Sequence, residues 1–134
     1  MSNKVGFVGA GFVGAEAARQ VMSEGIANVA LVDIMGDMAK GKALDLTESA
    51  PILKTSKHAI GGSSYELLKG CDVIVVTAGI PRKPGMSRDD LLKTNITITK
   101  QVCNGVKENA PGSIVIMVTN PLDAIVYVAQ EFLK

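Results

Sequence analysis

Three glycines between an apolar run and an amphipathic segment constrain the fold of this chain more than any other feature. Lys4 to Val8 is typical of a buried strand, and residues 11–24 carry apolar side chains at helical spacing. Between them, FVGAGFVG sets Gly9, Gly11 and Gly14 in a G-x-G-x-x-G register. A glycine turn that joins a strand directly to a helix is typical of the first unit of a parallel α/β sheet.

The same alternation of strand and helix continues along the chain. Further strands are predicted at residues 29–32, 57–60, 73–76 and 114–118, and helices at residues 36–49, 63–68, 87–110 and from 120 onward. This order favours an α/β fold with a doubly wound parallel sheet, the Rossmann fold, in the strand order 3-2-1-4-5. We expect residues 1–134 to form one such domain, which ends in a helical pattern with no strand after it.

The long predicted helix has a recognisable start and one apolar face. Ser87 and Asp90 form a Ser-x-x-Asp pattern, which predicts a capping box. The residues expected to share the apolar face are Leu92, Ile96, Val106 and Ala110.

The glycine turn also predicts a ligand. Gly9 permits a tight turn, Gly11 permits close approach to a pyrophosphate, and Gly14 permits close packing of helix on strand. The helix predicted at residues 11–24, whose first turn includes Phe12 and Val13, presents free N–H groups and a positive dipole end to the phosphates. The alternative is that these glycines serve only the turn.

Asp33 completes this pattern at the end of the second predicted strand, about 20 residues further on. A carboxylate there accepts hydrogen bonds from both ribose hydroxyls and repels a 2′-phosphate, so NAD is the predicted cofactor rather than NADP. Thr77, Ala78 and Gly79 end the fourth strand beside the point where the strand order reverses. Their small side chains allow a dinucleotide to lie against the backbone, although ordinary turn chemistry explains each residue equally well.

Composition and charge exclude several classes of function. Apolar residues make up 47% of the chain, charged residues 20%, and the net charge is +1, so neither nucleic acid nor a membrane is an expected partner. The strand-like VGFV follows MSNK directly, which leaves no room for a signal peptide. Cys71 and Cys103 lack metal-ligand spacing, so we expect reduced thiols, no metal site and a cytoplasmic protein.

A loop rich in Pro and Gly, TAGIPRKPGMSRDD, holds Arg82 and Arg88 shortly before the long helix. Two fixed cations in such a loop suggest an anionic small molecule over which the loop closes. On spacing alone, a pair of solvated surface cations explains the two arginines better.

Taken in order, GAGFVG, TAGIPRKPGMSRDDLLKTN and VTNPLD resemble the lactate/malate dehydrogenase family over essentially the whole chain. The Arg-x-Pro-Gly-x-x-Arg form resembles that of its malate-specific members. The resemblance implies that NAD is used to interconvert malate and oxaloacetate. It also implies that Arg82 pairs with the distal carboxylate, which the guanidinium fork suits, and that Arg88 polarises the reacting carbonyl.

The resemblance also assigns polar residues near the cofactor. It places Asn95 and Val118 beside NAD, and it gives Asn120 a hydrogen bond to the substrate next to the nicotinamide. The competing interpretation of Asn95 is a helix-surface residue, and that of Asn120 is a helix N-cap.

By the same resemblance, the catalytic His and Asp and a third Arg belong to a substrate domain after VTNPLD, which this sequence lacks. His58 is the single histidine, and we interpret it as a surface or edge residue. We therefore expect a homo-oligomeric chain that binds NAD without turnover and self-associates through an open sheet edge or its helix faces. The alternatives are a stand-alone, non-catalytic NAD-binding module and an unrelated Rossmann protein such as a methyltransferase that binds S-adenosylmethionine.

Overall fold

A five-stranded parallel sheet forms the centre of the molecule. The computed structural model describes residues 3–134 and has the strand order β3-β2-β1-β4-β5. The strands are β1 (Lys4–Val8), β2 (Asn28–Val32), β3 (Ala59–Gly62), β4 (Val73–Val76) and β5 (Ile114–Met117). The predicted doubly wound fold and its strand order are therefore confirmed.

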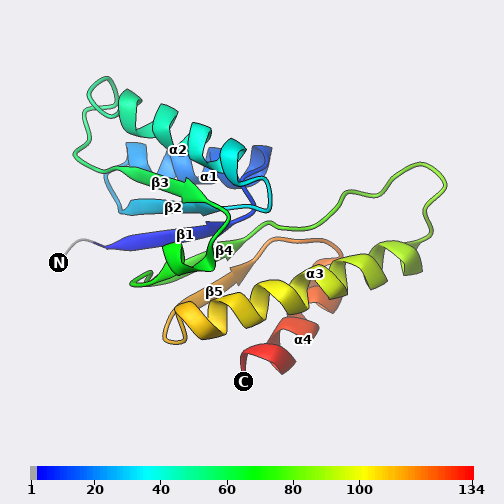
Figure 1. The fold of residues 1–134 in the computed structure, drawn as a ribbon. Helices are drawn as coiled ribbons and strands as arrows, with labels where there is room; N and C mark the ends of the chain where they lie inside the picture. Colours follow the sequence, from blue (N-terminus) through cyan, green and yellow to red (C-terminus); the bar gives the residue numbers. More distant parts are fainter. Residues whose placement is uncertain (1–2) are drawn as a thin grey trace.

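Helices cover the sheet on both faces. They are α1 (Phe12–Ser23), α2 (Gly36–Ser49), α3 (Arg88–Asn109) and α4 (Leu122–Leu133), with a 3₁₀ helix, η1 (Tyr65–Leu68). Figure 1 shows α1 and α2 on one face, and α3 and α4 on the other. Right-handed crossovers from a central β1 produce this arrangement, because the chain first winds toward β3 and then returns to β4.

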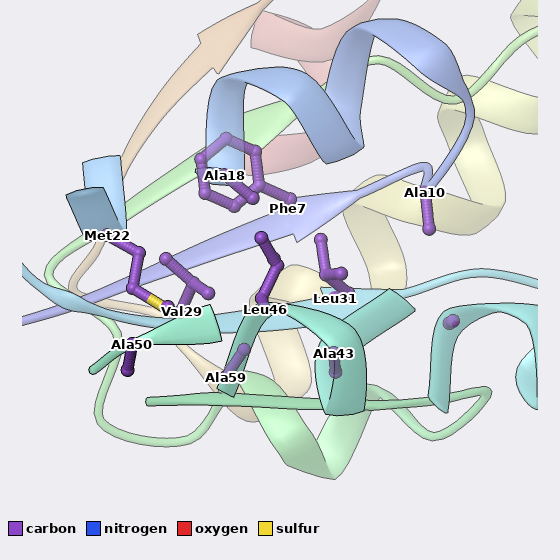
Figure 2. Packing of buried hydrophobic residues seen from close by; sticks show 11 residues of the cluster. Phe7, Ala10, Ala18, Met22, Val29, Leu31, Ala43, Leu46, Ala50 and Ala59 are labelled. Atoms are coloured by element: carbon purple, nitrogen blue, oxygen red, sulfur yellow. The ribbon is translucent and has the colours of Figure 1, made fainter. Parts of the chain in front are cut away.

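Alternate residues of the strands point into two separate apolar cores. Phe7 and Leu31 point toward α1 and α2, where they pack with Met22 and Leu46 (Figure 2). Val8, the neighbour of Phe7, points to the opposite face and belongs to the core beneath α3 and η1. The sheet is therefore buried on both faces near β1, as its continuous apolar runs predict.

The third strand lies two residues later than the sequence predicts, at residues 59–62 rather than 57–60. Side chains outside the strand account for the shift. The Thr55 hydroxyl accepts from the Lys57 N–H just before the strand. The His58 N–H donates to the Asn28 side chain at 3.1 Å instead of to a backbone carbonyl of β2, so the ladder begins with the bond from the Val29 N–H to the His58 carbonyl.

The buried face of α3 also differs from the predicted one. Its buried members are Asn95, Thr99, Val102, Cys103, Gly105 and Val106. Leu92 and Ile96 are only half-buried, and Ala110 is the C-cap rather than a helical residue. Two polar side chains therefore occupy positions where periodicity of apolar residues alone would place the core.

Candidate functional site

A cleft of about 690 Å³ opens at the carboxyl ends of the strands, where the strand order reverses between β1 and β4. Ligands of open α/β sheets bind at this position. The structure brings together in its lining all the residues that the sequence and the resemblance assigned to the cofactor: Gly9, Gly11, Phe12, Val13, Gly14, Asp33, Thr77, Ala78, Gly79, Asn95, Val118 and Asn120.

The glycine loop, residues 9–14, forms the floor of this cleft. Gly9 has a φ of 107°, donates to the Val32 carbonyl at 2.8 Å, and accepts from the Thr77 hydroxyl at 3.1 Å. A Cβ on Gly14 would overlap the Gly9 carbonyl, so α1 packs directly on the loop. A Cβ on Gly11 would meet no atom within 4 Å, because Gly11 faces open space.

The first turn of α1 fits an anionic group. Gly11 is its N-cap, no side chain caps the helix, and its first turn contains no acidic residue. The N–H groups of this turn therefore lack the side-chain acceptors that usually satisfy them. Together with the open space at Gly11, this arrangement suits the pyrophosphate of a dinucleotide.

Asp33 lies half-buried in the wall of the cleft, directly after β2. Its Oδ2 accepts from the Ala10 N–H at 2.8 Å, and its Oδ1 accepts from the Met35 N–H at 2.9 Å. Each carboxylate oxygen has a second lone pair, so both can still accept from a ligand hydroxyl. Asp33 thus fixes the loop and also offers a charged acceptor beside it.

Asn95 holds the opposite wall together, so its interpretation as a helix-surface residue is wrong. The residue is 1% exposed; its Oδ1 accepts from the Ile80 N–H at 2.9 Å and its Nδ2 donates to the Asn120 carbonyl at 2.7 Å. Asn120 is exposed at the cleft and is not the N-cap of α4, which is Pro121. The capping interpretation of Asn120 is therefore wrong as well.

Arg82 and Arg88 do not line the cleft. Both are exposed, and the segment between β4 and α3 extends away from the sheet (Figure 1). The Arg82 Nε donates to the Met86 carbonyl at 3.1 Å within this segment. Arg88 is the first residue of α3, where the predicted capping box between Ser87 and Asp90 is present.

Several lining residues have no clear signal in the sequence. They are Ile34, Ser63, Tyr65, Ile80, Ile98 and Gln101. Ile34 is 97% exposed and follows Asp33 at the end of a strand, so its position could have identified it. Tyr65 and Gln101 come from η1 and α3, which reach the cleft only through the tertiary fold.

Of three titratable groups that are wholly or partly buried, Tyr65 lines the cleft, whereas Cys71 and Cys103 do not. Burial raises the pKa of Tyr65 and of the free thiols Cys71 and Cys103. Within residues 3–134, no three His, Cys, Asp or Glu side chains are grouped so that they could hold a metal ion. No helix in the same range is both long and apolar enough to cross a membrane.

Comparison with known proteins agrees with this geometry. The sequence profile of the family described as lactate/malate dehydrogenase, NAD binding domain, matches residues 3–134. The malate dehydrogenase of Thermomicrobium roseum is 47% identical over 131 residues, which cover 98% of this chain and 42% of that protein. The malate dehydrogenase of Ehrlichia chaffeensis is 44% identical over 129 residues, which cover 96% of this chain and 41% of that protein.

Solved structures of the family superimpose closely. Malate dehydrogenase from Archaeoglobus fulgidus in complex with NADH has a TM-score of 0.92 and 44% identity, covering 96% of this chain and 44% of that chain. Lactate dehydrogenase from Cryptosporidium parvum, complexed with lactic acid and nicotinamide adenine dinucleotide, has the same TM-score at 36% identity, covering 99% of this chain and 42% of that chain. The fold alone therefore does not separate malate from lactate enzymes.

The chain spans between 41% and 42% of the length of the two curated relatives above. The part matched by the family profile includes both the glycine loop and the Asn120-Pro121 segment. Since the family profile covers nearly the whole chain and the strand order and cleft agree with it, this chain belongs to the lactate/malate dehydrogenase family and corresponds to its NAD-binding domain.

Proposed function

We propose that residues 1–134 act as the cofactor-binding domain of a malate dehydrogenase, with NAD(H) bound in the cleft at the carboxyl ends of β1 and β4. The glycine loop and the first turn of α1 would hold the pyrophosphate, and Asp33 would accept from the ribose hydroxyls. The main support is that the twelve residues assigned to the cofactor from the sequence line this one cleft. When bound, the cofactor supplies the hydride chemistry, and the chain supplies binding and orientation.

We infer that the substrate is a dicarboxylate, malate or oxaloacetate. The support is the pair Arg82 and Arg88 on a loop that begins next to the cleft residues Ile80 and Pro81, and the similarity to curated malate dehydrogenases. Because both arginines lie outside the cleft, the loop would have to close over the bound cofactor to bring a guanidinium to each end of the substrate.

Turnover by residues 1–134 alone is not expected. Hydride transfer to a carbonyl needs a proton donor. His58 is the single histidine, and it is exposed immediately before β3, at the end of the sheet opposite the cleft. We therefore expect NADH to bind without being oxidised by oxaloacetate. The buried, free Cys71 and Cys103 favour a reducing compartment, which we take to be the cytoplasm.

A fluorescence titration of NADH, with NADPH in parallel, tests this proposal. We expect saturable NADH binding and much weaker NADPH binding, because the Asp33 carboxylate repels a 2′-phosphate. In Asp33→Asn, NADH should bind more weakly and the preference over NADPH should fall. Asp45→Asn, on the exposed side of α2, is the matched control and should leave both affinities unchanged.

Two outcomes would contradict the proposal. Absence of saturable NADH binding to a chain with native circular dichroism would show that the cleft is not a cofactor site. Equal affinity for NADH and NADPH would show that Asp33 does not face the ribose.

A further inference from the structure

Ala10, in the middle of the glycine loop, is held by two oppositely charged side chains. Its N–H donates to Asp33 at 2.8 Å, and its carbonyl accepts from the Lys42 Nζ at 2.6 Å. Ala10 is 0% exposed, so both of its backbone groups need partners. Lys42 comes from α2, 32 residues further along the chain than Ala10.

The Lys42 ammonium has no carboxylate partner. Within residues 3–134, no acidic side chain lies within 4.0 Å of it, although the residue is half-buried. Its second neighbour is the ring of Phe12, the first residue of α1, at 5.7 Å from Nζ to the ring centroid. A cation beside the positive end of a helix dipole is unfavourable in the absence of an anion. The position of Lys42 therefore suits a site in which an anionic ligand binds at the N-terminus of α1.

The bond to Ala10 also acts on the next peptide group. The Ala10 carbonyl and the Gly11 N–H belong to the same peptide unit, so an ammonium on the carbonyl polarises the N–H and strengthens it as a donor. The Gly11 N–H donates to no group within residues 3–134, and a Cβ at this position would meet no atom within 4 Å. This N–H is therefore both polarised and available.

We propose that Lys42 is a positioning residue for the pyrophosphate of NAD, acting through the Ala10–Gly11 peptide and through an ammonium charge that forms no ion pair within residues 3–134. The inference rests on the proposed cofactor site, and it adds a residue from α2 to the glycine loop that the G-x-G-x-x-G pattern describes. If Lys42 only satisfied a buried carbonyl, replacing it would lower the stability of the folded chain. The affinity for NADH would then not depend on a cation at this position.

NADH titrations of Lys42→Met and Lys42→Arg test the proposal. Lys42→Met keeps the aliphatic chain and removes the cation, and we expect NADH affinity about tenfold lower, as for loss of a charge-assisted contact. Lys42→Arg keeps a cationic donor and should restore affinity to within about threefold of the wild-type value. Lys40→Met, an exposed lysine of the same helix, is the matched control and should bind NADH like the wild type.

Amide hydrogen exchange at Gly11 in the ligand-free chain gives a second readout that does not depend on the cofactor. We expect slower exchange in Lys42→Met than in the wild type and in Lys42→Arg, because the Gly11 N–H has no acceptor within residues 3–134 and is a weaker acid without the ammonium on the Ala10 carbonyl. A purely structural Lys42 would give the opposite result, since the loosened loop would exchange faster. Wild-type NADH affinity in a folded Lys42→Met chain would overturn the proposal, and so would equal Gly11 exchange in all three chains. If the wild type bound no NADH, the cofactor site itself would fail, and the exchange experiment would still decide whether Lys42 polarises the Ala10–Gly11 peptide.

Discussion

Arg82 has hydrogen-bond donors that no residue in the range 3–134 accepts. Its Nε is used within the loop by the Met86 carbonyl, but its two terminal nitrogens make no hydrogen bond to any residue in the range 3–134. These nitrogens form the planar pair that matches a carboxylate. Lys83, its neighbour, is equally exposed but carries a point charge without this geometry.

Arg82→Gln tests the proposed dicarboxylate site at the level of one side chain. In the wild type, we expect oxaloacetate to tighten NADH binding, because the loop can close over both ligands, while pyruvate has a smaller effect. Arg82→Gln should lose most of the oxaloacetate effect, and Lys83→Gln should retain it. The measurement is NADH fluorescence at a series of oxaloacetate concentrations. An equal response in the two variants would show that charge alone, rather than Arg82, attracts the substrate.

The role of a single residue can be predicted from the sequence where its neighbours along the chain determine that role. The glycine loop and Asp33 are recognisable because spacing along the chain sets their geometry. Lys42 and Asn95 are different, since their partners Ala10 and Asn120 are distant in sequence and meet them only in the folded chain. No periodicity of apolar residues contains that information.

Among the helices, α1 and α2 offer a matched pair of internal glycines. Gly14 packs against the carbonyl of Gly9, whereas a Cβ on Gly41 would meet nothing within 4 Å. Glycine inside a helix costs about 0.5–1 kcal/mol relative to alanine when no contact forbids the change. The two positions should therefore respond to the same substitution with opposite signs.

We expect Gly41→Ala to raise the free energy of unfolding by about 0.5–1 kcal/mol. Gly14→Ala should lower it by about 1–3 kcal/mol, because α1 must move off the loop. It should also weaken NADH binding, while Gly41→Ala should not. Urea unfolding followed by circular dichroism measures the stabilities. A stabilising Gly14→Ala would mean that α1 does not pack on the loop as described.

Element boundaries show where local patterns stop being sufficient. The starts of β1 and α3 agree with prediction because a continuous apolar run and a capping box define them within a few residues. The start of β3 does not, since the Asn28 side chain accepts from the His58 N–H in place of a backbone carbonyl. The buried face of α3 was misjudged for a similar reason, because Asn95 is satisfied by loops that periodicity ignores.

At the scale of the molecule, no helix within residues 3–134 covers β5 on one face of the sheet. Ile114 and Ile116 of β5 share the face of Phe7, as their register through Val73 and Val75 shows. On that face α1 and α2 pack over β1 to β3, and the two isoleucines remain 68% and 49% exposed. Among residues 3–134 no strand pairs with the outer edge of β5, which favours association with another chain.

We therefore expect the chain to self-associate and Ile116→Lys to reduce this association, since a charge on an exposed strand opposes pairing. Sedimentation velocity over a wide concentration range measures the effect. Ile52→Lys is the control, because Ile52 is 84% exposed but lies in the turns after α2. A wild-type chain that stays monomeric throughout, or equal effects of the two variants, would exclude β5 as the interface.

The two cores differ in how they are distributed along the chain. The buried members of the core under α1 and α2 all fall between Phe7 and Ala59, whereas those of the other core extend from Val8 to Ala110. During synthesis the first core can close before β4 exists, at a small cost in loop entropy, while the second must wait for α3. Pulse-labelled hydrogen exchange should accordingly show β2 protected before β5, and the reverse order would refute this. The central strand would then serve first as the edge of a three-stranded nucleus and only later as the middle of the finished sheet.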